Sequence, residues 1–207
     1  MWVILFRLLF VPDRSGPKAC FMRTSFLPRS EDEKKFKELI LYVSQKCATD
    51  PTFGATKLNK ILFYADFLAY ANLGKAITNF DYQKLPNGPA PRRLLPIRDQ
   101  MVADHELVLQ QIRLLSGNIQ KRTVNVRQPD LRIFTGEEIA LVDEIIEAFE
   151  KAKAEVVSEL SHRMVGWMLV ENGESIPYNT VFLSNEELTP AEIERGRELA
   201  GEYDLLA

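Results

Sequence analysis

The sequence predicts an α+β fold that is mostly α-helical: a compact bundle of about five to six helices with a small antiparallel β-hairpin at residues 106–127. Three observations support this prediction. Apolar residues recur at spacings of three and four over most of the chain, which is helical periodicity. One segment instead holds two β-prone runs separated by Ser116-Gly117-Asn118, which is typical of a hairpin. The composition, 46% hydrophobic and 27% charged, is that of an ordinary globular domain.

The first two helices are predicted over residues 31–47 and 56–73. Ser30 and Glu33 have the spacing of a capping box, and an apolar stripe at helical spacing runs from there to Cys47. We expect Cys47 to be a buried thiol because it lies on that stripe. The second segment is apolar on most sides, which predicts a central, buried helix that stops at Gly74.

The stretch LPNGPAPRRLLP, residues 85–96, separates the second helix from the third. FDYQKL, just before it, predicts a short strand, and Asn87-Gly88 predicts a tight turn. Proline is tolerated in a helix only within the first turn, where the backbone N–H has no partner. Pro96 therefore places the third helix at about residues 93–104.

The second half of the chain predicts the hairpin and then more helices. The first arm of the hairpin is partly a continuous apolar run, which a helix would also fit. Thr135 and Glu138 form a capping box before a strongly amphipathic helix. A further helical stretch covers about residues 153–170, with interruptions near Ser161-His162 and Gly166. Pro190 opens a last helix at its first position.

We expect three parts along the chain. Residues 31–188 form the folded domain, and residues 189–207 add a C-terminal helix that is packed on it or appended to it. Residues 1–30 are expected to be disordered, or to result from a gene start placed too early. Their apolar run, MWVILFRLLFV, is interrupted by Arg7 and is far shorter than the ~20 residues that span a bilayer.

Charge is unevenly distributed along the chain, whose net charge is −3. Residues 84–132 carry 9 Lys and Arg against 4 Asp and Glu, whereas residues 133–207 carry 5 against 17. A basic middle favours an acidic partner or a phosphate backbone. Charged faces of a single domain can also simply be solvated, and we prefer that interpretation for the charge distribution taken alone.

Few residues are available for metal or redox chemistry. The cysteines are Cys20 and Cys47 and the histidines are His105 and His162, and their spacing fits neither a metal site nor a disulfide framework. We therefore expect no metal, no cofactor and a reducing cytoplasm. The sequence also lacks a phosphate-binding loop, a dinucleotide fingerprint, a zinc-protease motif and a nucleophile elbow, so we expect no enzyme.

Two alternative functions follow from the residues alone. Three helices before a hairpin predict a winged-helix DNA-binding regulator. Its basic residues would be Arg92, Arg93 and Arg98 near the recognition helix and Lys121 and Arg122 on the wing. The third helix has few side chains suited to base reading, and the acidic last third would repel phosphate. Ser161 and His162 would suit a hydrolase, but adjacent helical residues do not face each other. A structural or partner-binding role for His162 is preferred.

Several motifs occur in the order found in one protein family. TKLNKILFYADFLAYANLGKAIT has a Lys-Leu-x-Lys core before a Gly and a Thr, a Tyr…Gly-Pro element follows, and a Leu-Ser-His…Trp element lies further on. Together they resemble the Panacea antitoxin domain (SocA-like) over about residues 35–185. The chain departs from the family at Asn59, where glutamine is common, and in its longer tail. The matching residues are Lys57, Leu58, Lys60, Leu62, Tyr64, Gly74, Thr78, Tyr82, Gly88, Pro89, Leu160, Ser161, His162 and Trp167.

The resemblance implies an antitoxin of a bacterial or phage toxin–antitoxin system. Such a protein binds a cognate toxin, encoded next to it, and blocks the toxin or hands it to proteolytic machinery. The resemblance therefore implies a protein partner, with no membrane. A binding role also agrees with the lack of catalytic motifs.

The motif residues of the second helix have two expected roles. Leu58 and Tyr64 are expected in the core. Lys57 and Lys60 border the buried stripe, and they pair either with carboxylates inside the domain or with an acidic toxin surface. We leave these two alternatives open.

The other candidate residues lie near the turn and in the last motif. Arg92 and Arg93 stand at a helix N-terminus, where the helix dipole does not stabilise cations. We therefore expect them to face an acidic partner. Trp167 belongs to the core or, where exposed, to an interface. His162 is expected to orient a loop by hydrogen bonding.

Overall fold

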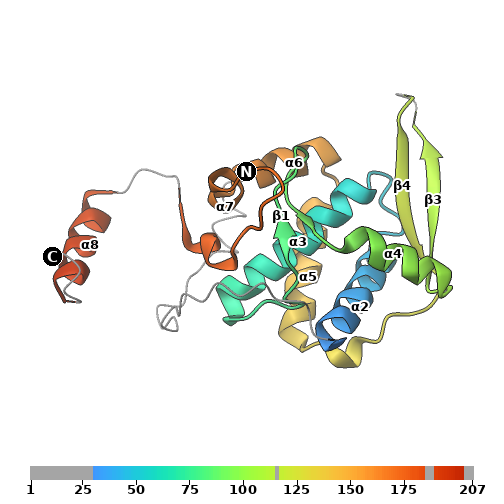
Figure 1. The fold of residues 1–207 in the computed structure, drawn as a ribbon, viewed down its shortest axis with the longest axis horizontal. Helices are drawn as coiled ribbons and strands as arrows, with labels where there is room; N and C mark the ends of the chain where they lie inside the picture. The colour runs from blue at the N-terminus through green and yellow to red at the C-terminus, as the bar shows by residue number, and fades with distance from the viewer. Residues whose placement is uncertain (1–29, 115–116, 185–188, 203–207) are drawn as a thin grey trace.

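The computed structural model describes residues 30–114, 117–184 and 189–202. Within these ranges the chain is mostly helical and has two small antiparallel sheets, so the predicted α+β class is confirmed (Figure 1). The expectation for residues 1–30 falls, except for Ser30, outside the described part. The elements are α2 (Ser30–Lys46), α3 (Ala55–Leu73), β1 (Tyr82–Gln83), β2 (Ala90–Pro91), α4 (Leu94–Ala103), β3 (Leu107–Arg113), β4 (Ile119–Asn125), η1 (Leu131–Ile133), α5 (Gly136–Phe149), α6 (Ala154–His162), α7 (Val165–Leu169), η2 (Tyr178–Phe182) and α8 (Pro190–Glu202).

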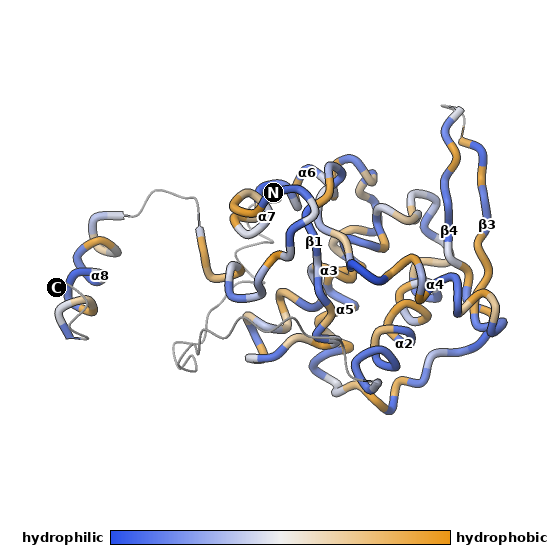
Figure 2. The backbone as a smooth tube through the Cα atoms, viewed as in Figure 1, coloured by the Kyte–Doolittle hydropathy of each residue, from blue (hydrophilic) through white to orange (hydrophobic). Residues whose placement is uncertain are grey.

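The central element is α3, which contacts α2, α5, α6 and η2. Its apolar residues face several directions, as predicted, and nearly all of them are buried. Gly74 ends the helix in the left-handed conformation, with φ of 74°. Of the described helices, none is long and apolar enough to cross a bilayer. The core therefore forms around α3, and the tube in Figure 2 shows hydrophobic stretches in both α2 and α3.

Helices α2 and α5 are amphipathic and pack on α3 through their apolar faces. The predicted capping box of α5 is present: Thr135 and Glu138 bond each other's backbone N–H groups. Glu138 also accepts the Lys35 ammonium at 2.7 Å, which joins α5 to α2. This contact explains why Glu138 is buried although it is charged.

The first sheet holds the turn that the sequence predicted at residues 87–88. Strands β1 and β2 pair antiparallel, with Tyr82 opposite Pro91. The sequence predicted the strand near Tyr82 but not its partner. Backbone bonds from Ile176 N to Tyr82 O (2.7 Å) and from Lys84 N to Glu174 O (2.9 Å) add a third segment beside β1. These backbone bonds help to hold the turn between β1 and β2 in place next to α3.

The second sheet is the predicted hairpin, formed by β3 and β4. β4 packs against α2 and α3, whereas β3 is the outer strand (Figure 1). The third helix, α4, begins at Leu94, so Pro96 falls in its first turn as predicted. The predicted helix at 153–170 is divided into α6 and α7, at the interruption expected near His162. α8 stands apart from the body in Figure 1.

A buried carboxylate in α3 ties the segment after this helix to the core. Asp66 accepts hydrogen bonds from Thr78 N at 2.7 Å, from Thr78 Oγ1 and from Tyr82 Oη at 2.8 Å. Tyr178, stacked beside Tyr70, donates to Phe80 O at 2.6 Å. Burial raises the pKa of Asp66 to about 6, although the bonds from Thr78 and Tyr82 act in the opposite direction.

Asp66→Asn is expected to change how stability depends on pH. The folded pKa of Asp66 lies above the ordinary 3.8, so protonated Asp66 stabilises the fold and this contribution is lost as pH rises through about 6. Denaturant unfolding between about pH 4 and 7 should show the wild type losing roughly 3 kcal/mol relative to Asp66→Asn, at about 1.4 kcal/mol per pKa unit. Asp99→Asn, at an exposed carboxylate, is the matched control for the loss of one negative charge. A constant difference between wild type and Asp66→Asn would contradict this assignment.

Candidate functional site

The candidate site is centred on the buried amine of Lys60. Its side chain is 1% exposed, and Nζ donates to Asn87 O at 2.6 Å and to Pro89 O at 3.0 Å. Among the described residues, no carboxylate forms an ion pair with it. Burial lowers the pKa of Lys60 to about 7, because a charge is costly where water is excluded. A neutral amine has two N–H groups, one for each of these carbonyls.

The turn above Lys60 requires glycine at position 88. Gly88 N donates to Leu85 O at 2.9 Å, and the residue has φ of 89°. This is the left-handed region, where a side chain is strained. A Cβ at this position would also collide with Ser161 Oγ and would lie 2.7 Å from Lys60 Nζ. Two independent constraints therefore explain the Gly-Pro element that the sequence singled out.

Helix α6 holds the other side of this turn. Ser158 Oγ donates to Asn87 O at 2.7 Å, so that this carbonyl accepts from both Ser158 and Lys60. Ser161 is fully buried, and its Oγ donates to Ser158 O at 2.6 Å. The three family motifs, which are far apart in the sequence, thus meet at one point. We call this group the motif cluster: Lys60, Asn87, Gly88, Pro89, Ser158 and Ser161.

The edge of the motif cluster is an aromatic stack. The rings of His162 and Trp167 lie 4.2 Å apart and are nearly parallel, at 20°. Trp167 Nε1 donates to Leu85 O at 3.3 Å, and Lys84 Nζ lies 4.5 Å from the Trp167 ring centroid. This position suits a cation–π contact. Trp167 is half-buried and so belongs to both the core and the surface.

His162 differs from the expectation that it orients a loop by hydrogen bonding. Its Nε2 is buried and has no hydrogen-bond partner among the residues that the structure describes. Desolvation is the main cause that lowers its pKa; Lys60, when protonated, and Lys84 act in the same direction, and Glu159 acts in the opposite one. The neutral imidazole is therefore favoured, and its contact with Trp167 is stacking rather than a charged interaction.

The other motif residues of α3 point into the domain. Leu58 and Tyr64 are buried, as predicted, and the Tyr64 ring makes an edge contact with Phe149 of α5. Lys57 is 0% exposed; its Nζ lies 2.5 Å from Asp50 Oδ2 and donates to Glu150 O at 3.1 Å. Of the two pairings left open by the sequence, Lys57 therefore makes the one with a carboxylate inside the domain.

Lys60 takes neither alternative, because its partners are backbone carbonyls. The burial of Lys57 and Lys60 leaves neither ammonium a surface to offer a partner in this structure. A contact surface must therefore be sought among the exposed residues around the motif cluster.

Arg92 and Arg93 both have acidic neighbours inside the domain. Arg92 bonds Asp81 at 2.8 Å and also donates to Gly173 O and Ser175 Oγ. Through these bonds, Arg92 links Asp81, the residue before β1, to the segment of Gly173 and Ser175 that lies beside this strand. Arg93 forms one ion pair, at 3.2 Å, with Glu33 of α2. Internal partners thus account for both cations at the start of α4, where the sequence suggested an acidic partner protein.

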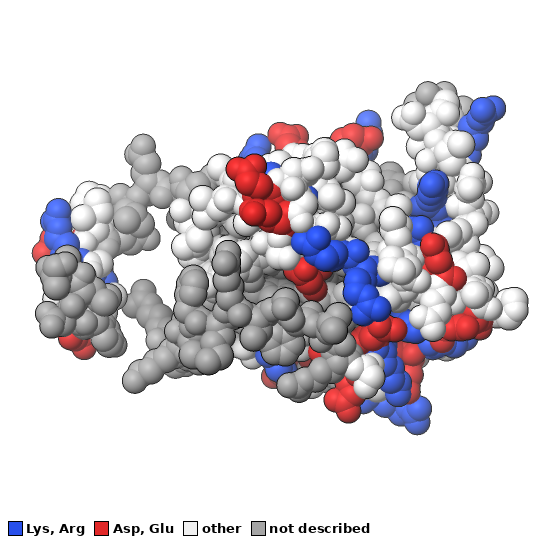
Figure 3. All heavy atoms as spheres, in the orientation of Figure 1, with Lys and Arg blue, Asp and Glu red and all other residues white. Residues whose placement is uncertain are grey.

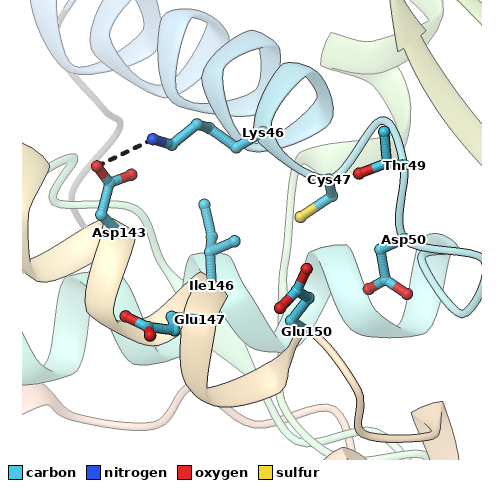
Figure 4. A pocket seen from close by; sticks show the side chains of 8 residues that line it. All are labelled: Lys46, Cys47, Thr49, Asp50, Asp143, Ile146, Glu147 and Glu150. Atoms are coloured by element: carbon cyan, nitrogen blue, oxygen red, sulfur yellow. Dashed lines mark ion pairs between the residues drawn. The ribbon is translucent and has the colours of Figure 1, made fainter.

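A shallow hollow of about 330 Å³ lies between α2 and α5 (Figure 4), and a second, of about 580 Å³, is lined by residues that include Glu33, Glu38 and Arg127. The hollow between α2 and α5 is lined by four carboxylates, of Asp50, Asp143, Glu147 and Glu150, and Asp143 pairs with Lys46 at 3.1 Å. No group of side chains within the described ranges has the arrangement of a metal site. Cys47, which also lines the hollow between α2 and α5, is buried, and burial is the main cause that raises the pKa of its thiol to about 12. A reactive thiolate is therefore unfavourable at this position.

The geometry weakens both alternative functions. Arg98, one of the three arginines that a winged-helix interpretation places near the DNA, is only 9% exposed, and Arg92 and Arg93 are already paired with Asp81 and Glu33. Ser161, which a hydrolase interpretation needs as nucleophile, is 0% exposed and directs its hydroxyl at a backbone carbonyl. Neither residue is positioned for the role that its alternative requires.

Sequence reasoning missed Asp66, Ser158 and Lys84. Asp66 had a signal, since it is the one acidic residue in the apolar run of α3 and such a residue needs buried partners. Ser158 and Lys84 had none, because their partners are backbone carbonyls and a ring from distant segments.

The fold is that of a small, mostly helical domain. Its candidate site is a turn held in place by the hydrogen bonds of the motif cluster. The family model of the "Antitoxin SocA-like, Panacea domain" matches residues 58–168, more than half of the chain. The protein belongs to this antitoxin-like family. Searches of curated proteins and of solved structures found no match.

Gly88→Ala is expected to destabilise the domain more than Gly74→Ala does. Both glycines have positive φ, but a Cβ at Gly74 would meet nothing within 4 Å, whereas one at Gly88 would collide with Ser161 and Lys60. Gly74→Ala should cost about 1 kcal/mol from backbone strain, and Gly88→Ala roughly 1–3 kcal/mol more from overpacking. Urea unfolding of both variants measures the difference. Equal losses would show that the motif cluster is not closely packed.

Proposed function

We propose that this protein is an antitoxin that neutralises its cognate toxin by direct protein–protein binding. Family membership supports an antitoxin assignment in general. The observation that carries the finer proposal is that the family-motif residues Lys60, Gly88 and Ser161 pack together at a turn, which Lys60 holds by hydrogen bonds, instead of lining a substrate cavity. A rigid support beneath a surface suits recognition of another protein.

The exposed residues that follow the supported turn form the proposed contact surface. Lys60 fixes the carbonyl of Pro89, and β2 then leads directly into Arg92 and Arg93 at the start of α4. Figure 3 shows a band of basic side chains on this face, between β1 and α4, with acidic side chains beside it. A toxin with an acidic surface would be complementary to this band.

Arg93 is the residue of this band best suited to change partners. The side chains of Arg93 and Glu33 are 44% and 26% exposed, and ion pairs open to solvent contribute only about 0–1 kcal/mol. A toxin carboxylate could therefore replace Glu33 at little cost. Arg92 is bound to several groups of its own domain, so we assign it to shaping the surface. Transfer of the bound toxin to proteolytic machinery would use the same complex.

The proposal is tested by co-expression with the toxin expected to be encoded beside this chain. Toxin expression alone should stop growth; co-expression should restore growth, and the two proteins should co-purify. Growth arrest that persists with normal amounts of folded antitoxin, together with failure to co-purify, would refute neutralisation by direct binding. Rescue without a complex would refute the binding mechanism while leaving an antitoxin role.

Arg93→Glu is expected to weaken toxin binding about tenfold or more while the fold persists. The substitution places a carboxylate near Glu33 and reverses the charge that an acidic partner would meet. Affinity of the purified pair, measured by calorimetry at two salt concentrations, should fall for Arg93→Glu and lose part of its salt dependence. Arg197→Glu, at an exposed and similarly paired arginine of α8, is the matched control and should bind as the wild type does. Unchanged affinity of Arg93→Glu would remove this residue from the interface.

A further inference from the structure

The outer edge of the β3–β4 hairpin is unprotected. β4 is the inner strand: Arg122 donates to the carbonyls of Cys47 and Asp50, and Thr123 bonds Ser44 of α2. β3 lies on the far side of β4 and projects with it beyond the body of the domain (Figure 1). No element of the described chain covers β3 beyond its first residues.

The register identifies which backbone groups of β3 point outward. Hydrogen bonds join Val126 N to Glu106 O at 2.8 Å and Leu114 N to Asn118 O at 2.9 Å. Directly opposite residues in an antiparallel pair alternate between bonded and non-bonded pairs. The even-numbered residues of β3 therefore bond β4, and the N–H and C=O groups of its odd-numbered residues face away from it, three of them beyond the buried Leu107. These are Leu109, Gln111 and Arg113. Within the described residues, no backbone bond from another element reaches these groups.

This edge lacks the devices that usually prevent strand addition. Exposed edges are commonly blunted by proline, by charged side chains or by a bulge. Residues 107–112, LVLQQI, contain no proline, no glycine and no charge, and their pairing with β4 is continuous. Val108 is 47% exposed and Leu109 37% exposed, although both are apolar. Figure 2 shows these hydrophobic stretches on a strand that stands outside the core.

The charge of the hairpin indicates the chemistry of an occupant. Residues 107–125 contain Arg113, Lys121 and Arg122 but no Asp or Glu among those that the structure describes. Within the same described part, none of these three cations forms an ion pair. A second copy of the chain would bring its own Arg113 and Lys121 and no hairpin carboxylate to the edge, which is unfavourable, since Arg122 is buried against the domain. An acidic segment would instead neutralise the charges near Arg113 and Lys121.

We propose that the β3 edge binds an extended segment of the toxin as a third strand, with acidic residues of that segment beside Arg113 and Lys121. Backbone groups of Leu109, Gln111 and Arg113 supply the hydrogen bonds, and exposed apolar side chains of β3 supply burial. The inference rests on the proposed toxin-neutralising function and adds to it a second contact surface, separate from the band around Arg93.

Gln111→Pro tests the edge without breaking the hairpin. Proline removes the outward N–H of residue 111 and places its ring where a third strand would lie, whereas the bonds to β4 come from neighbouring residues. Gln111→Ala, which keeps the N–H, is the matched control. Toxin affinity should fall at least tenfold for Gln111→Pro and remain within about twofold for Gln111→Ala. Amide exchange of the wild-type complex should show protection at Leu109, Gln111 and Arg113.

The outcomes separate this inference from the function on which it rests. Circular dichroism and the amide exchange of β4 in the free variant confirm that its hairpin is intact. Wild type and Gln111→Pro binding the toxin equally, with no protection at the β3 edge, would overturn strand addition and leave neutralisation standing. A wild type that neither binds nor rescues would overturn both. Arg113→Glu combined with Lys121→Glu provides a second measurement, and unchanged affinity would contradict the acidic segment.

Discussion

The buried amine of Lys60 is the constraint on which the rest of the site depends. A lysine side chain removed from water must lose its proton or find strong acceptors, since an unpaired buried charge is costly. Lys60 meets this requirement with two backbone carbonyls, of Asn87 and Pro89, at the turn between β1 and β2. The turn is thereby fixed above α3, and the motif residues of α6 close around it. Lys57, three residues earlier on the same helix, solves the same problem differently, with the carboxylate of Asp50.

Much of the fold follows from local sequence patterns. Helical periodicity predicted α2, α3 and α5, Pro96 fixed the start of α4, and Thr135 with Glu138 marked a capping box that is present. The contacts of the site could not be predicted in the same way. Lys57 and Lys60 are the same residue type in the same helix, and only the tertiary positions of Asp50 and the turn distinguish them. The partners of Lys60 are backbone carbonyls, which carry no side-chain signal in a sequence. The pairing of β2 with β1 likewise depends on contacts across a turn rather than on strand propensity.

The buried core of the domain and its exposed surface use their polar groups differently. In the centre, polar groups such as Asp66 and Ser161 are buried and hydrogen-bonded, so the motif residues mainly specify shape. At the margin, the band around Arg93 and the outer edge of β3 present exposed charge, free backbone groups and apolar side chains. This division fits an antitoxin-like domain in which the shape of the domain and the choice of partner depend on different residues. It also explains why the residues most easily matched to the family motif are not the ones best placed to touch a partner.

The most direct test of this account is the pKa of the Lys60 amine in the folded protein. Carbon-13-labelled lysine, followed by NMR from about pH 6 to 11, reports each side chain separately, and a Lys60→Met variant assigns the resonance. The account predicts a midpoint of about 7 for Lys60, because its acceptors are carbonyls and no carboxylate stabilises the charge. A midpoint near the ordinary 10.5 would contradict it, since it would show that the amine is hydrated or paired and does not hold the turn in the way described.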